Sequence, residues 1–225
     1  MNTQNLKAVL EEISNGNNLG EKITLVGATK TMSAETINDA ISAGLKVVAE
    51  NRVQEFREKH DKIVGAEQQF IGHLQTNKVK YLVGKVSLIQ SVDSVHLAEE
   101  ISKQAIKLNT VQNVLIEINV GGELSKSGFD TDNAESFVKE IASNLNGVKV
   151  VGLMAMLPQT DDKELLKELC LKMRGIYDKL KSSGLNLSIL SMGMSSDYKI
   201  AINNGSNMIR LGRTIFGERN YGEKI

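Results

Sequence analysis

The feature that most constrains this chain is a regular alternation of short apolar runs with amphipathic segments. The short runs are rich in β-branched residues and bounded by turn-forming residues, which is typical of buried strands. The longer segments between them place apolar residues three and four positions apart, which is typical of helices with one buried face. This order predicts an α/β fold with a parallel sheet. The predicted strands span residues 23–29, 46–50, 68–72, 88–92, 113–120, 149–156, 188–193 and 207–212.

Eight predicted strands separated by helices, without a long linker or low-complexity tract, indicate a single domain over residues 1–225. We expect a closed (β/α)8 TIM barrel preceded by an extra N-terminal helix. An open, doubly wound sheet is the alternative, because continuously apolar strands are covered on both faces in either arrangement. Ser33 and Asp93 stand where helix N-caps belong, and Gly44 and Gly184 stand where helices stop.

Composition excludes several classes of function. Lysine plus arginine equals aspartate plus glutamate at 27 each, so no net field attracts nucleic acid or an anionic membrane. Cys170 is the only cysteine, which excludes an intramolecular disulfide and a thiolate metal cluster and fits a reducing compartment. The N-terminus lacks the features of a signal peptide, and no apolar run approaches membrane-spanning length. We expect a cytoplasmic protein that binds neither nucleic acid nor membrane and holds no metal.

Polar residues gather at the carboxyl ends of the predicted strands, which is where a TIM barrel forms its site. Lys30 ends the first strand, beside an expected ring that includes Asn51, His73, Arg210 and Arg213. A lysine near other cations and partly removed from water has a lowered pKa, so more of it is the neutral amine that attacks a carbonyl. Lys30 is therefore a candidate Schiff-base former, with a solvent-reaching surface lysine as the alternative. For His73, hydrogen bonding that orders its loop is at least as good an interpretation as acid–base catalysis.

The last two predicted strands run into turns that contain glycine. Gly193 and Ser195 follow one strand, and Gly212 follows the other. Backbone amides at such helix starts, with serine hydroxyls and arginine, suit a phosphate dianion, although each glycine alone is typical of an ordinary turn. A carbonyl-reactive lysine facing a phosphate site fits pyridoxal 5′-phosphate. A Schiff-base aldolase acting on a phosphorylated aldehyde or ketone fits the same pattern.

Several motifs, in order along the chain, resemble those of the YggS/PROSC family of pyridoxal phosphate homeostasis proteins. They are ATKT at residues 28–31, then AENRVQEF, FIGHLQTNK, INVGGELSKSGF, GLMAML, LSMGMSSD and IRLGRTIFGER. The resemblance covers residues 23–220 and implies a fold similar to the N-terminal barrel of alanine racemase, with the cofactor held as an internal aldimine. Thr29 departs from the serine usual in the family, and Arg213 from a small residue such as threonine or serine.

The resemblance also implies roles for individual residues. Lys30 would form the aldimine, Ser195 and Gly212 would hold the phosphate, and Arg210 would contact either the ring nitrogen or the phosphate. The remaining members of the set would line the pocket. The implied cofactor-binding residues are Lys30, Asn51, His73, Met192, Ser195, Arg210, Gly212 and Arg213.

The family role implied by this resemblance is homeostasis of vitamin B6 rather than efficient catalysis. A racemase of related fold needs a second base, a tyrosine, and no tyrosine here has a neighbouring pattern that marks it as one. The expected partners are pyridoxal 5′-phosphate and client enzymes that require it, and we expect a monomer. An amino-acid racemase that uses Lys30 as a base is the enzymatic alternative. The segment Lys126 to Phe129 is interpreted as a turn rather than a ligand loop.

Overall fold

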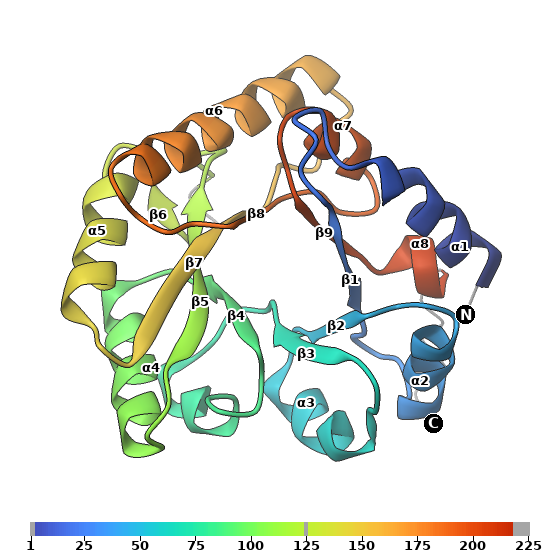
Figure 1. The fold of residues 1–225 in the computed structure, drawn as a ribbon, viewed down its shortest axis with the longest axis horizontal. Helices are drawn as coiled ribbons and strands as arrows, with labels where there is room; N and C mark the ends of the chain where they lie inside the picture. Colours follow the sequence, from blue (N-terminus) through green and yellow to red (C-terminus); the bar gives the residue numbers. More distant parts are fainter. Residues whose placement is uncertain (1–2, 124–125, 218–225) are drawn as a thin grey trace.

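Eight parallel strands close into a barrel in the computed structural model, which describes residues 3–123 and 126–217 (Figure 1). Hydrogen-bonded neighbours follow the order β4-β3-β2-β1-β9-β8-β7-β5, and β5 also pairs with β4, which completes the ring. The predicted TIM barrel is confirmed, and the open sheet is wrong. The barrel strands are β1 (Thr24–Ala28), β2 (Val47–Glu50), β3 (Glu67–Phe70), β4 (Leu88–Val92), β5 (Gln112–Asn119), β7 (Val148–Ala155), β8 (Ile189–Ser191) and β9 (Met208–Leu211).

One short strand lies outside this ring and was not predicted. Strand β6 (Phe129–Asp130) pairs in parallel with the end of β5, where Ile118 and Asn119 face its two residues. Two residues are too few for hydrophobic periodicity to reveal a strand.

Helices surround the barrel on its outer side (Figure 1). The predicted N-terminal helix is present as α1, whereas a 3-10 helix, η3, stands between β3 and β4. Within the described ranges, no helix is long and apolar enough to span a bilayer. The helices are α1 (Thr3–Glu12), α2 (Ala34–Ser42), α3 (Val53–Lys59), α4 (Val95–Lys107), α5 (Ala134–Asn144), α6 (Lys163–Ser182), α7 (Tyr198–Asn203) and α8 (Arg213–Phe216), with the 3-10 helices η1 (Ile13–Asn15), η2 (His60–Lys62) and η3 (Thr76–Tyr81).

Three of the four predicted helix-boundary residues take the expected places. Ser33 caps α2, and Gly44 and Gly184 follow α2 and α6 with φ angles of +115° and +98°, a conformation that favours glycine. The N-cap of α4 is Ser94 and not Asp93, because the Ser94 hydroxyl accepts the backbone N–H of Leu97 in the first turn of the helix. The Asp93 carboxylate instead contacts a histidine of the candidate site, described below.

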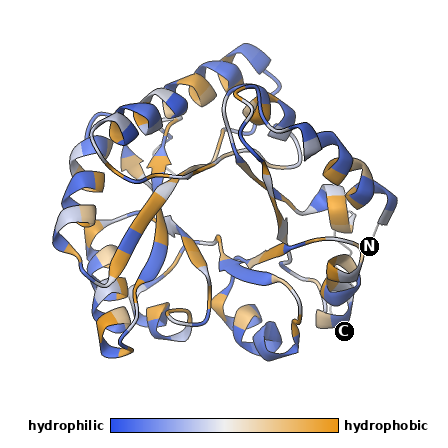
Figure 2. Ribbon diagram, in the orientation of Figure 1, coloured by the Kyte–Doolittle hydropathy of each residue, from blue (hydrophilic) through white to orange (hydrophobic). Residues whose placement is uncertain are grey.

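The apolar core has two layers. Inside the barrel, six of the eight strands contribute one cluster of buried residues: Val26, Val47, Ala49, Leu88, Leu115, Met154 and Met208. Larger clusters fill the space between strands and helices. The helices accordingly carry both hydrophobic and hydrophilic residues (Figure 2). Two packed layers hold the strand ends rigidly, and the candidate site is built on those ends.

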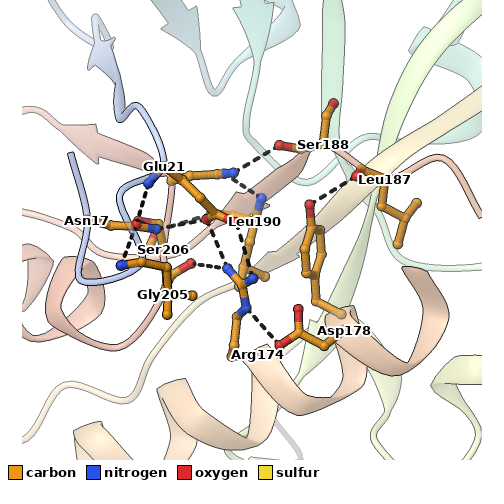
Figure 3. Close-up of polar contacts among 12 residues, drawn as sticks. Asn17, Glu21, Arg174, Asp178, Leu187, Ser188, Leu190, Gly205 and Ser206 are labelled. Atoms are coloured by element: carbon orange, nitrogen blue, oxygen red, sulfur yellow. Dashed lines mark hydrogen bonds and ion pairs between the residues drawn. The ribbon is translucent and has the colours of Figure 1, made fainter. Parts of the chain in front are cut away.

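Arg174 of α6 links the segments that precede β1 and β9, close to where these two strands pair (Figure 3). Its guanidinium donates to Glu21, just before β1, at 2.9 Å, to Asp178 at 3.0 Å and to the carbonyl of Gly205, before β9, at 3.1 Å. The Asn17 amide donates to the same Glu21 carboxylate at 2.8 Å. The cluster joins the segment before β1, the segment before β9 and a surrounding helix at the point where the first and last strands meet.

Candidate functional site

A cavity of about 810 Å³ opens at the carboxyl ends of the barrel strands. Its volume is within the range of about 300–1,000 Å³ that is typical of small-molecule sites. Seven of the eight predicted binding residues line it, although they are spread over nearly 200 positions of the sequence. They are Lys30, Asn51, His73, Ser195, Arg210, Gly212 and Arg213.

The structure does not bring Met192 to this cavity. Its side chain is fully buried in the apolar cluster between the strands and the helices. Met194, two positions later in the loop after β8, lines the cavity instead. The prediction identified the loop after β8 correctly but chose a residue whose side chain points away from the cavity, because the sequence alone did not fix where β8 ends.

Lys30 follows a residue that is fixed by a buried charge. The Thr29 hydroxyl, fully buried, donates to the Glu50 carboxylate at 2.7 Å. Lys59 of α3 contacts the same Glu50 oxygen at 2.7 Å and donates to the Thr29 carbonyl at 3.2 Å. Burial raises the pKa of Glu50, while the hydrogen bonds from Lys59 and Thr29 act in the opposite direction. The backbone that precedes Lys30 is therefore held from both strand β2 and helix α3.

The residue that follows Lys30 is fixed from the same helix. Thr31 has a φ of +67°, a left-handed conformation that is uncommon for a threonine. Its backbone N–H donates to the Glu55 carboxylate at 2.7 Å, and Glu55 also pairs with Lys59 at 2.9 Å. Lys30 thus lies between two restrained neighbours, so its loop presents the side chain to the cavity in a defined direction.

Arg210 is held inside the barrel by a chain of side-chain hydrogen bonds. Its guanidinium donates to the Ser191 hydroxyl at 2.7 Å and to the Ala155 carbonyl at 3.0 Å. Ser191 donates to Gln90 at 2.8 Å, and Gln90 donates to Gln69 at 2.7 Å. Burial lowers the pKa of Arg210 to about 10, so it stays charged at neutral pH. The barrel interior therefore supplies a fixed cation to the floor of the cavity.

Two loops at the cavity rim are joined to each other. The Ser195 hydroxyl, after β8, accepts the backbone N–H of Thr214, after β9, at 3.3 Å. Gly193 has a φ of +101°, and an added Cβ would lie 2.8 Å from the Ala201 side chain, so the turn requires glycine. Gly212 begins the short helix α8. Ser195, Gly212 and exposed Arg213 line the cavity together with Lys30, whereas Gly193 shapes the turn behind them.

Asn51 and His73 occupy the wall that follows β2 and β3. The Asn51 amide oxygen is buried and has no hydrogen-bond partner within the described ranges, which leaves it able to accept from a ligand. His73 is exposed, and its Nδ1 lies 3.0 Å from the Asp93 carboxylate and 3.5 Å from the Ser127 hydroxyl. These contacts support the interpretation of His73 as a residue that orders its loop.

Three further features of the site were not predicted. Glu117, toward the carboxyl end of β5, lines the cavity and is 6% exposed. Burial raises its pKa to about 7, and the nearby negative charge of Asp93 adds to this. Its only sequence signal is one carboxylate within the apolar run VLIEINV. Lys126 and Ser127, which the sequence favoured as part of a turn, also line the cavity. The contacts of Lys59 with Glu50 and Glu55 had no signal that separated them from surface charge pairs.

The donor set fits pyridoxal 5′-phosphate better than a metal ion. A lysine, two arginines, an unpartnered amide oxygen and a glycine-rich rim suit an aldehyde with a phosphate group. Within residues 3–123 and 126–217, no three His, Cys, Asp or Glu side chains are grouped so that they could hold a metal.

Comparisons with known proteins agree with this geometry. Residues 4–220 match the family described as alanine racemase, N-terminal domain. The chain is 44% identical over 221 residues to the pyridoxal phosphate homeostasis protein of Aquifex aeolicus, covering 97% of this chain and 95% of that protein. It is 34% identical over 209 residues to the protein of the same name from Escherichia coli, covering 91% and 89%. The solved structure of PipY from Synechococcus elongatus with pyridoxal phosphate bound has a TM-score of 0.84 at 27% identity, covering 96% of this chain and 99% of that one.

Proposed function

This chain belongs to the alanine racemase N-terminal domain family, and from that premise we propose that it binds pyridoxal 5′-phosphate and acts in the homeostasis of this cofactor. The observation that carries the proposal is the meeting of Lys30, the Ser195 and Gly212 rim and Arg210 in one cavity. The naming of full-length relatives as homeostasis proteins and the cofactor bound by PipY support it.

In this proposal, each part of the cofactor has a separate set of contacts. Lys30 would hold the aldehyde end, because its neutral Nζ can condense with the aldehyde carbon while the aldehyde oxygen leaves as water. Ser195, Gly212 and Arg213 bind the phosphate at the rim, where backbone N–H groups and a cation gather. Arg210 is anchored by Ser191 and Ala155 in the barrel interior, which favours contact with the ring end over the phosphate.

Asn51 and His73 complete the proposed binding wall. The unpartnered Asn51 oxygen gains a hydrogen-bond donor when the cofactor or its water enters, and His73 keeps the loop after β3 in place through Asp93. Met192 has no direct role, because its side chain lies outside the cavity.

We further propose that the protein holds and delivers the cofactor, as a monomer in the cytoplasm, to client enzymes that require it. The names of the relatives favour this role over efficient turnover. Family membership favours one second candidate, slow amino-acid racemisation with Lys30 as a base. Lys30-dependent exchange of the α-hydrogen of an amino acid for deuterium would support that candidate, and its absence would support the carrier. The Schiff-base aldolase has no support from the relatives.

The visible absorption spectrum of the purified protein tests the proposed cofactor site. We expect a Schiff-base band that is lost in Lys30→Ala, and a reduced pyridoxyl mass on the Lys30 peptide after borohydride treatment. Lys126→Ala is the matched control, because Lys126 lines the same cavity, and its protein should keep the band. A wild-type protein that stays colourless with added pyridoxal phosphate would contradict the proposal.

A further inference from the structure

One buried charge in the cavity has no role in the proposed cofactor contacts. Glu117 lies in β5, is 6% exposed and lines the cavity. Within residues 3–123 and 126–217, no side chain or backbone group forms a hydrogen bond or ion pair with its carboxylate. Burying a carboxylate without such contacts is unfavourable, because the charge loses its hydration and gains nothing in return. Because Glu117 lines the cavity, a bound ligand can donate the hydrogen bonds that its carboxylate lacks.

The charged groups around Glu117 favour a cationic ligand. Asp93, after β4, adds a second negative charge nearby, while Arg210 from β9 and His73 after β3 act on Glu117 in the opposite sense. Arg210 is already occupied by Ser191 and Ala155, and the nearest acceptor for the His73 ring is Asp93. Neither cation therefore forms an ion pair with Glu117, and the carboxylate remains available.

Glu117 lies across the barrel from Lys30. Strands β1 and β5 are four strands apart in either direction around the closed ring, so they form opposite walls. The rim that suits the phosphate is next to β1, because Gly212 and Arg213 follow β9, the neighbour of β1. The cavity thus has a cationic side that suits the cofactor phosphate. Glu117 lies on the opposite wall, where the other charged side chain, Lys126, pairs with Glu123. The cavity volume of about 810 Å³ is near the upper end of the typical range, which leaves room for a second small molecule.

We propose that Glu117 binds the ammonium group of a second ligand, a small primary amine, which occupies the β5 side of the cavity next to the cofactor. The inference rests on the proposed function for its choice of amine, because the aldehyde chemistry of pyridoxal phosphate is with primary amines. The ammonium N–H groups donate to the Glu117 carboxylate, and the charge of Asp93 adds attraction. A charge-assisted contact of this kind gives the Glu117 carboxylate the direct partner that the described residues do not supply.

The test uses protein in which borohydride has locked the cofactor onto Lys30, so that an added amine cannot displace it. L-alanine and propionate, which differ by the ammonium group, are titrated by calorimetry. We expect L-alanine to bind at least tenfold more tightly than propionate, and Glu117→Gln to lower its affinity about tenfold or more. Glu123→Gln, which changes a carboxylate on the adjoining loop, is the control and should bind like wild type. Equal binding of propionate, or an unchanged affinity in Glu117→Gln, would overturn the proposal.

A second readout uses wild-type protein alone and does not depend on the folding of a variant. Near pH 7, the binding of L-alanine should release protons, because ammonium binding favours the ionised form of Glu117; at pH 8.5 this release should be smaller. Calorimetry in buffers of different ionisation enthalpy measures the protons released, and an identical value at both pH values would overturn the proposal. Should the cofactor fail to lock onto Lys30, the proposed function fails by itself, and the same titrations on cofactor-free protein still test Glu117.

Discussion

The barrel contains two buried carboxylates, Glu50 on β2 and Glu117 on β5, that have opposite surroundings. They are 4% and 6% exposed. One oxygen of Glu50 contacts Lys59 at 2.7 Å and accepts from Thr29 at 2.7 Å. Within the part of the chain that the structure describes, the Glu117 carboxylate has no such contact and lines the cavity. Equal burial therefore does not imply an equal role.

The difference indicates what each charge does. Glu50 is a structural charge that fixes the backbone before Lys30, and removing its partner would leave an uncompensated ion in the interior. Glu117 has the charges of Arg210 and His73 nearby but no direct contact with either, so the folded protein tolerates its cost and keeps a group that a ligand can use. Functional sites commonly retain such unfavourable groups while the surrounding structure satisfies its own.

The largest expected effect is on the paired carboxylate. Lys59→Met should lower the free energy of unfolding by about 3–5 kcal/mol, because Glu50 stays buried without its cation. Urea denaturation measures this loss. Adding Glu50→Gln to Lys59→Met should restore much of the stability, since the buried charge is then gone. If the double variant is as unstable as the single one, the effect comes from packing and not from charge.

The unpaired carboxylate, Glu117, should make the free energy of unfolding depend on pH. The pKa of Glu117 is raised to about 7, so its side chain stays protonated in the folded protein at pH values where the unfolded chain already ionises. The contribution to stability is fully present below about pH 4.5 and is lost as pH rises through about 7, a total of about 3 kcal/mol.

Glu117→Gln isolates this contribution. The difference in unfolding free energy between wild type and Glu117→Gln, measured by urea denaturation at pH 5 and pH 8, should change by about 2–3 kcal/mol in favour of the variant at pH 8. Other carboxylates cancel in this difference. A constant difference at both pH values would show that Glu117 ionises normally in the folded state.

A smaller effect should follow from removing the neutral donor to Glu50. Thr29→Val keeps the shape of the side chain but loses the hydroxyl, and we expect a loss of about 1–2 kcal/mol in the free energy of unfolding. Thr29→Ser keeps the O–H group and serves as the control for that bond. A loss in Thr29→Ser as large as that in Thr29→Val, or no loss in Thr29→Val, would contradict the assignment of the effect to the hydrogen bond.

The smallest effect should be at an exposed pair. Lys179 contacts Glu135 at 2.6 Å, but its side chain is 70% exposed. Lys179→Met should change stability by no more than about 0.5 kcal/mol, because water screens this pair. Thermal unfolding compared with Lys59→Met measures the contrast; losses of similar size would remove burial as the reason that the Glu50 pair matters.

The sequence predicted the barrel from local patterns that do not depend on the closed structure. Alternating strand and helix periods, with Ser33 as a cap and Gly44 as a stop, are encoded in neighbouring residues. The same patterns identified the strand ends, and thereby Lys30, Ser195 and Gly212 as residues that line the cavity. They predicted Asp93 as the cap of α4, which is wrong by one residue: Ser94 is the cap, and the Asp93 carboxylate contacts the distant His73 instead.

The sequence by itself thus determined the order of elements and most of the polar groups at the barrel mouth. Only the tertiary structure decided that Glu50 is paired and Glu117 is not, and that Met192 faces the core. Glu50, Glu117 and Met192 are single side chains within or next to apolar strand patterns. The role of each depends on which distant residues the closed barrel brings within about 3 Å. Periodicity assigns a residue to a face, whereas contacts between residues far apart in the chain decide whether a buried charge is satisfied.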